Sequence, residues 1–416
     1  MGKVVELEGG VRSRGRGRRR RSKAALVLGG GGFTGGVYEI GALRALDLLS
    51  VDRTVNQFDV YVGTSAGALI AALASNGVTP EQMMRVVNDQ VPQPFRDVSL
   101  DMLLRPNYRE FVAKGVRLPF HVLGLLREVG RALPTFSTVD LAVALADLLP
   151  SGLYTGSGIE EYVRTVLSDP DRTDDFRELE CELYLAATDL DTCERIVLGA
   201  AGWDDVPIST AVRASTALPM VYQPTQVKDR ELVDGGIVST TNLDIAVEAG
   251  AKLIVVVNPL VPYVNDFTKE IPTLFGTRTR RVSDMGFPRI GYQTFKLLAY
   301  QRLHEVARGW RDRYPGVDIV LIEPDTDDEL MFQTNILDYR SRLEVARHGF
   351  QSVTVKLAAD YEELREVCAR HGFEISATRV RKVVRHFEAQ KGDKSSAWRR
   401  ILEQTTGTLL RQSASD

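Results

Sequence analysis

The segment Phe58–Gly67, with the sequence FDVYVGTSAG, most constrains how this chain can fold. A mostly apolar run ends in Gly63-Thr64-Ser65-Ala66-Gly67, and the Ala/Leu-rich segment ALIAALAS follows at once. This pattern predicts a strand, an abrupt turn and a helix, which is the context of a G-x-S-x-G nucleophile elbow. In such a turn neighbouring backbones press on both glycines, and the strained serine exposes its hydroxyl at a helix N-terminus. Ordinary Gly/Ser turns also contain this pentapeptide by chance, so the rest of the chain must decide.

A glycine-rich loop precedes the elbow and follows a predicted buried strand, Ala24–Leu28. The loop, GGGGFTGG, leads into the helical pattern VYEIGALRALDLLS. Residues 30–35 fit the dinucleotide fingerprint G-x-G-x-x-G, with Asp47 or Asp52 as a candidate ribose ligand, but VDRTVNQ is too polar and short for the required second strand. The loop can instead present backbone N–H groups to an anion, either a phosphate or an oxyanion. The loop alone leaves both open, and Ser65 favours the oxyanion.

A serine nucleophile needs a base, and the histidines are poor candidates for it. None of the five lies in a glycine-rich or strand-end loop, and most lie in helical patterns: His121, His304, His348, His371 and His386. We therefore expect solvated or helix-face histidines, and a Ser-His-Asp triad has weak support.

The other available base is a carboxylate at Asp234. It ends the predicted strand Glu231–Val233 and precedes Gly235-Gly236, so the chain turns sharply beside it. Ligands gather at the carboxyl ends of the strands of a parallel sheet, where Ser65 and residues 29–32 are also expected. The simpler alternative is an ordinary Asp-Gly β-turn.

Further alternating elements predict an α/β fold with three layers, α/β/α, and a mostly parallel central sheet. Besides those above, the predicted strands are Leu183–Thr188, Arg195–Leu198, Lys252–Asn258 and Val317–Ile322, and the predicted helices are Gly158–Leu167, Pro207–Ala214, 290–312 and 337–371. We expect one domain at 24–325, with a mostly helical insertion at about 80–150 and a helical C-terminal extension at 326–416. Within the insertion, Arg117–Pro134 is either an ordinary amphipathic helix or a lid that meets lipid.

Charge is uneven along the 416 residues. Residues 1–23 carry nine basic and two acidic side chains, so the net charge of −3 leaves −10 on the rest of the chain. We expect a disordered arm at 1–23 that is either a solvated tail or attracted to anionic lipid or nucleic acid. The acidic body argues against a nucleic-acid-binding core.

The expected location is the cytoplasm, with peripheral membrane association as an extension of it. Three scattered cysteines (Cys181, Cys193, Cys368) form neither a disulfide framework nor a metal spacing. No apolar run reaches the ~18–20 residues of a membrane span, and Ala24–Leu28 is too short for a signal peptide.

Together, the loop GGGGFTGG, the elbow GTSAG and the segment Asp234-Gly235-Gly236 resemble the patatin-like phospholipase family, in the same order. The segments VYEIGAL, ATDLDT and RASTALPMVYQP are also similar to family sequence, and the resemblance runs from about Ala24 to about Pro262. It implies a Ser-Asp dyad that cleaves lipid or other esters through an acyl-enzyme, with Ser65 as nucleophile and Asp234 as base.

The resemblance further implies an oxyanion hole of backbone N–H groups from Gly30, Gly31, Gly32 and Ala66. Gly35, Gly63, Gly67, Gly235 and Gly236 support the motifs, and no metal or cofactor is expected. Thr34 departs from the family, because Phe33-Thr34 replaces the common pair of a small residue and a cation. That departure motivates the alternative of a weakly active or non-catalytic lipid-binding protein. Head group, acyl length and oligomeric state are left open.

Overall fold

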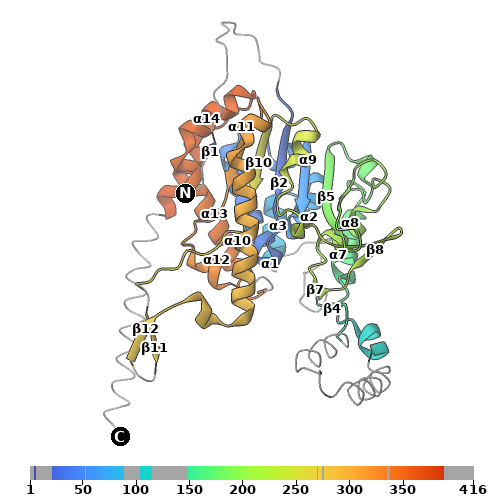
Figure 1. The fold of residues 1–416 in the computed structure, drawn as a ribbon. Helices are drawn as coiled ribbons and strands as arrows, with labels where there is room; N and C mark the ends of the chain where they lie inside the picture. The colour runs from blue at the N-terminus through green and yellow to red at the C-terminus, as the bar shows by residue number, and fades with distance from the viewer. Residues whose placement is uncertain are drawn as a thin grey trace.

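A central β-sheet organises the computed structural model, which describes residues 4–5, 21–51, 53–88, 104–114, 149–268, 270–273, 276–334 and 338–387 (Figure 1). Among these residues, nine strands form it in the order β1-β13-β10-β2-β3-β5-β9-β8, with β6 also pairing with β5. The five strands from β13 to β5 are parallel, whereas β1, β6, β8 and β9 join antiparallel. The strands are β1 (Val4–Val5), β2 (Ala24–Leu28), β3 (Val60–Thr64), β5 (Glu182–Asp189), β6 (Arg195–Leu198), β8 (Thr225–Val227), β9 (Arg230–Asp234), β10 (Leu253–Val257) and β13 (Asp318–Ile322).

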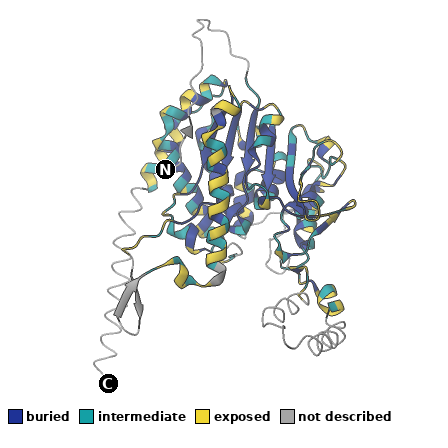
Figure 2. Cartoon of the chain, in the orientation of Figure 1, coloured by how far each residue is buried: buried dark blue, intermediate teal, exposed yellow. Residues whose placement is uncertain are grey.

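Helices cover both faces of the sheet, because the strands alternate buried apolar side chains between two hydrophobic clusters. One face packs against α1 (Gly32–Leu49), α2 (Ala66–Ser75), α3 (Pro80–Val87), α7 (Ser157–Leu167), α8 (Ile208–Ser215), α12 (Glu329–Gln333), α13 (Arg342–Ala359) and α14 (Tyr361–Arg370). The other packs against α9 (Leu243–Glu248), α10 (Phe287–Arg308) and α11 (Trp310–Arg313). Figure 2 shows the buried sheet and the exposed outer surface of α10. The predicted three-layer α/β/α fold is confirmed.

Short elements complete the described chain. These are the pair β4 (Gly152–Tyr154) and β7 (Met220–Tyr222), the hairpin β11 (Glu270–Thr273) and β12 (Gly276–Thr279), and the 3₁₀ turns η1 (Val55–Gln57), η2 (Phe176–Glu178), η3 (Gly235–Ile237) and η4 (Val282–Met285). No helix within the described ranges is long and apolar enough to cross a membrane.

The structure revises several predicted boundaries. Of the arm, the structure describes residues 4–5 and 21–23: Val4–Val5 pair with β13, and Arg21 donates to Asp59. The predicted helix 337–371 is two helices that meet at Asp360, and 290–312 divides at Gly309. In the expected insertion, α3 packs against α1 and residues 108–114 are helical, while Arg117–Pro134 lies outside the described residues.

The C-terminal extension packs on the domain through the crossing of α1 and α13. A Cβ at Gly41 of α1 would lie 2.4 Å from the Ala346 carbonyl oxygen, and one at Gly349 of α13 would lie 2.6 Å from the Tyr38 carbonyl oxygen. These distances are too short for a Cβ atom at either position. The backbones of α1 and α13 can therefore pack this closely only because both residues are glycine.

We therefore expect Gly349→Ala to lower the free energy of unfolding by about 1–3 kcal/mol, because an added methyl group overpacks this contact. Chemical denaturation would measure the loss. The matched control is Gly291→Ala in α10, where nothing lies within 4 Å of an added Cβ. There the higher helix propensity of alanine should leave stability unchanged or raise it by up to ~1 kcal/mol. Equal effects at both positions would contradict the close crossing.

Glu39 is an acidic residue buried in the middle of α1. Its side chain is fully buried, and neither carboxyl oxygen has a well-formed hydrogen bond with the described residues; the nearby Gly29 backbone offsets the burial only in part. Burial raises the pKa of this carboxyl well above its ordinary value. The folded protein therefore holds a proton here at pH values where the unfolded chain has lost it.

This difference predicts that stability declines as pH rises above the ordinary glutamate pKa, by up to ~1.4 kcal/mol per pH unit, until the folded-state pKa is reached. Glu39→Gln, which keeps the shape without the charge, should lack the part of the decline that Glu39 causes, so its stability relative to wild type should increase as pH rises above the ordinary glutamate pKa. Denaturant titrations across pH would measure both. Glu231→Gln at an exposed position is the control and should keep the wild-type slope.

Candidate active site

Ser65 lies in the sharp turn between β3 and α2, with φ 56° and ψ −126°. This left-handed conformation is costly for a residue with a side chain, so the surrounding structure must hold it. A Cβ at Gly63 would lie 2.5 Å from the Ala68 Cα, and one at Gly67 would lie 2.4 Å from the Leu28 carbonyl oxygen. The close backbone approach predicted from the sequence at both glycines is therefore present.

Asp234 reaches the serine from β9, but not in the way the sequence suggested. We expected it at the carboxyl end of a parallel strand, whereas β9 runs antiparallel to β5. The two still meet, because β9 pairs with the last residues of β5: Asp234 lies opposite Ala187, and the adjacent Ala186 lies opposite Thr64 of β3. An antiparallel strand thus returns its last residue to the edge of the sheet where β3 ends.

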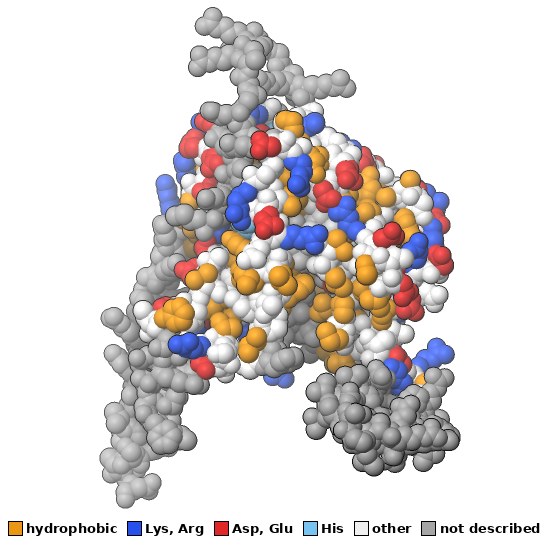
Figure 3. Space-filling model, viewed as in Figure 1, with side chains coloured by type: hydrophobic (Ala, Val, Ile, Leu, Met, Phe, Trp, Pro, Cys, Tyr) orange, Lys and Arg blue, Asp and Glu red, His pale blue; other side chains and the backbone are white. Residues whose placement is uncertain are grey.

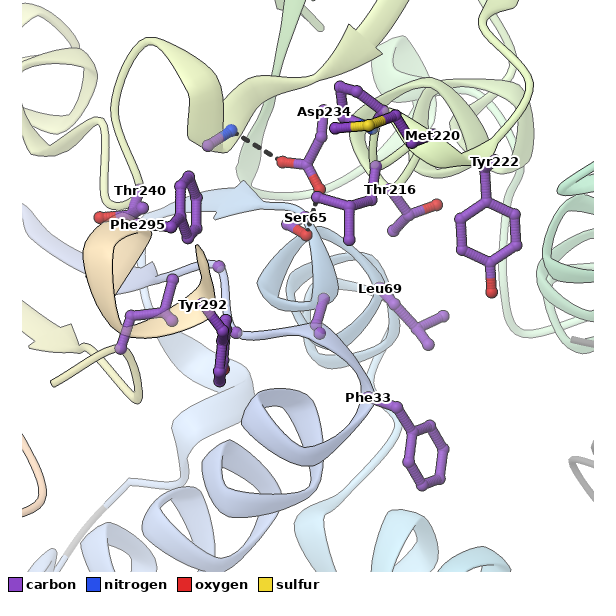
Figure 4. A pocket seen from close by; sticks show the side chains of 18 of the residues that line it. Phe33, Ser65, Leu69, Thr216, Met220, Tyr222, Asp234, Thr240, Tyr292 and Phe295 are labelled. Atoms are coloured by element: carbon purple, nitrogen blue, oxygen red, sulfur yellow. Dashed lines mark hydrogen bonds between the residues drawn. The ribbon is translucent and has the colours of Figure 1, made fainter. Parts of the chain in front are cut away.

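The two side chains form a direct hydrogen bond. Ser65 Oγ donates to Asp234 Oδ2 over 2.5 Å, and the Gly236 N–H donates to Oδ1 over 2.8 Å (Figure 4). Asp234 is 3% exposed, and burial raises the pKa of its carboxyl to about 6, although both hydrogen bonds oppose the rise. A carboxylate with such a pKa is ionised at neutral pH and still basic enough to take a proton.

Ser215 holds the turn from the side of α8. The Ser65 N–H donates to Ser215 Oγ over 3.0 Å, and that hydroxyl donates to the Ala186 carbonyl over 2.6 Å. These two hydrogen bonds tie the turn at Ser65 to β5. The sequence analysis quoted Ser215 within RASTALPMVYQP but assigned it no role, and the only available signal was that similarity.

The glycine-rich loop has fewer free N–H donors than expected. The Gly30 N–H donates to the Thr240 carbonyl over 2.9 Å, so it is already occupied in this structure, and its role as an oxyanion donor stays a prediction. The N–H groups of Gly31, Gly32 and Ala66 make no hydrogen bond with the described residues, and all three residues line the cavity. Gly32 begins α1 and Ala66 begins α2, so two helix N-termini meet at Ser65.

An apolar cavity of about 360 Å³ opens over the serine. Figure 4 shows Leu69 and Phe33 on one side of Ser65, and Tyr292 and Phe295 of α10 on another. The sequence analysis did not identify the α10 residues, nor Met220 and Tyr339, because nothing in their local patterns points to Ser65. Such a lining fits a long apolar group and leaves the few polar groups to fix its reacting end.

The remaining predicted residues occupy supporting positions. Gly35 packs against Pro259, and a Cβ at Gly235 would lie 2.3 Å from the Ala186 carbonyl oxygen. Thr34 is 4% exposed and does not line the cavity. Its hydroxyl supplies no charge in place of the expected cation.

The described histidines all lie away from the cavity lining. His304 and His348 lie on helices and pair with Glu323 and Asp328. His371 departs from the expectation of a solvated histidine, because it is 7% exposed and bonds to Asp318 over 2.8 Å. His386 is exposed on a helix, and His121 lies outside the described residues.

Comparison with known proteins adds a family match and distant structural likenesses. The family model described as patatin-like phospholipase matches residues 26–247, more than half of the chain. The structure of VipD from Legionella pneumophila is 14% identical with a TM-score of 0.35, and the match covers 82% of this chain and 67% of VipD. That of the type III effector ExoU is 15% identical with a TM-score of 0.31, and the match covers 86% of this chain and 54% of ExoU.

The raised pKa of Asp234 predicts how the reactivity of Ser65 depends on pH. A fluorophosphonate should label Ser65 about tenfold faster at pH 7 than at pH 5, because the Asp234 carboxyl loses its proton around pH 6 and can then accept that of the serine. Asp234→Asn should label slowly and without this rise. Mass spectrometry would follow labelling, with circular dichroism as a control for folding. A rate that is flat between these pH values would contradict the pairing.

Proposed function

Because the chain belongs to the patatin-like phospholipase family, we propose that it is a serine lipid acyl hydrolase that cleaves carboxylic esters with a Ser-Asp dyad. The observation that carries this proposal is the 2.5 Å hydrogen bond from Ser65 Oγ to Asp234 Oδ2 beneath an apolar cavity. The dyad supplies a nucleophile and its base, and the cavity takes an acyl chain.

In the first half-reaction Ser65 Oγ attacks the ester carbonyl carbon, and its proton passes to Asp234 Oδ2. The carbonyl oxygen becomes an oxyanion that accepts hydrogen bonds from the N–H groups of Gly31, Gly32 and Ala66. As the tetrahedral intermediate collapses, Asp234 returns the proton to the leaving alcohol, and the acyl group stays on Ser65.

The second half-reaction repeats these steps with water. Asp234, ionised again, accepts a proton from a water molecule that attacks the acyl-enzyme carbonyl. Collapse of the second intermediate releases the carboxylic acid, and the proton on Asp234 returns to Ser65 Oγ. The burial of Asp234 supports this role, because it raises the pKa of the carboxyl and so makes the carboxylate a better base.

We also propose that the ester substrate comes from a lipid surface. Met220 lines the cavity and is 82% exposed, with a left-handed φ of 66°, and Ile290 beside the cavity residue Gly291 is 43% exposed. In the view of Figure 3, hydrophobic side chains gather on the lower half of the molecule, and most of the charged side chains lie above them. An apolar mouth of this kind lowers the cost of moving a lipid from an aggregate into the cavity.

The dyad is tested by hydrolysis of p-nitrophenyl acyl esters and of phospholipid in mixed micelles. Ser65→Ala and Asp234→Asn should each lower kcat by about 10³-fold or more, because each removes one half of a unit that acts together. The matched controls are Ser75→Ala near the end of α2 and Asp191→Asn on the surface, which should keep wild-type rates.

Two outcomes would overturn the assignment. Turnover retained by Ser65→Ala would place the nucleophile elsewhere. A wild-type protein without turnover that still binds lipid would favour the alternative raised by Thr34, a non-catalytic lipid-binding protein.

A further inference from the structure

A second apolar cavity of about 90 Å³ adjoins the first. The two cavities share four lining residues, Phe33, Ala66, Leu69 and Tyr339. The second cavity continues between α1, α2 and α3, with Ile40, Leu73 and Met83 among its walls. No step of the reaction described above uses it.

One face of α2 leads from the nucleophile into this second cavity. Ala66 and Leu69 line both cavities, and Ile70 and Leu73 line the second. Positions 66, 69, 70 and 73 lie on one side of a helix, so they form a continuous apolar stripe about 10 Å long that starts beside Ser65. A straight chain held at the serine can therefore follow α2 toward the second cavity.

Two aromatic rings stand where the cavities meet. The ring centroids of Phe33 and Tyr339 are 5.3 Å apart, and Figure 4 shows Phe33 beyond Leu69, pointing away from Ser65. The Arg342 guanidinium lies 4.1 Å from the Tyr339 ring centroid and donates to the Val87 carbonyl over 3.0 Å. The Tyr339 ring thus contacts both Phe33 and Arg342, and Arg342 is itself hydrogen-bonded to the end of α3.

We infer that the second cavity is the distal end of an acyl-chain site, and that Phe33 and Tyr339 close it and so set the acyl-chain length accepted at Ser65. The ligand is an uncharged hydrocarbon chain, because the residues that line the second cavity are apolar or aromatic apart from Arg342, whose guanidinium is engaged by the Tyr339 ring and the Val87 carbonyl. The inference rests on the proposed function, and it makes Phe33 and Tyr339 the residues that determine which acyl-chain lengths are accepted.

The test compares kcat/KM for p-nitrophenyl octanoate and p-nitrophenyl hexadecanoate. Phe33→Ala and Tyr339→Ala should each raise the ratio of the long to the short ester, by about fourfold for each further methylene group that becomes buried. Phe295→Ala is the matched control, because this phenylalanine lines the first cavity but not the second. It should keep the wild-type ratio.

A second pair of variants locates the chain end. Met83→Ala enlarges only the second cavity, so by itself it should leave the ratio of the long to the short ester at the wild-type value. Combined with Phe33→Ala, it should raise that ratio above the value of Phe33→Ala alone. An unchanged ratio in folded Phe33→Ala, or an equal shift in Phe295→Ala, would overturn the inference.

Binding separates this inference from the proposed function. In the Ser65→Ala protein, octanol and hexadecanol would displace 1-anilinonaphthalene-8-sulfonate, which requires no turnover. Phe33→Ala in that background should favour hexadecanol over octanol relative to its parent. If the wild-type protein has no turnover but Phe33→Ala shifts alcohol binding in this way, the chain-length site stands and the hydrolase assignment falls. If the wild type turns over esters but Phe33→Ala shifts neither binding nor the ester ratio, the hydrolase assignment stands and the chain-length site falls.

Discussion

The strained backbone at Ser65 is the constraint on which the rest of the site depends. A φ of 56° costs of order 1–3 kcal/mol for a residue with a side chain, and it persists only where the surroundings over-determine it. Gly63 and Gly67 allow β2, β3 and α2 to approach closely, and Ser215 fixes the Ser65 N–H. With the turn held in this way, the hydroxyl projects toward Asp234 without further rearrangement.

The hydrogen bond between Ser65 and Asp234 in turn depends on the change of strand direction beyond β3. Because β9 is antiparallel, it runs back along the end of β5, with Leu232 opposite Asp189 and Asp234 opposite Ala187. Its last residue therefore lies within reach of Ser65. The same arrangement buries Asp234 away from any positive partner among the described residues, and that burial is why its pKa lies near 6.

Helix α1 joins the loop at the site to the C-terminal extension. Its first turn carries Phe33, its middle contacts α13 through Gly41 and Gly349, and Tyr339 just before α13 meets Phe33 at the cavity. The extension is therefore part of the pocket wall as well as a cover for the core. Arg342 at the start of α13 also lines the second cavity, so α13 contributes to its wall directly.

The sequence by itself determined the class of fold, the elbow and the two other motifs, because glycine spacing and apolar periodicity are local patterns that can be identified without the structure. It predicted Ser65 and Asp234 as partners, and the structure brings them together, while their catalytic roles stay a proposal. Only the tertiary structure decided the direction of β9, the hydrogen bond from the Gly30 N–H to the Thr240 carbonyl, and the buried partner of His371. It alone brought Tyr292, Phe295 and Tyr339 to the cavity, since these residues lie more than two hundred positions from Ser65 and their contacts arise from packing between helices.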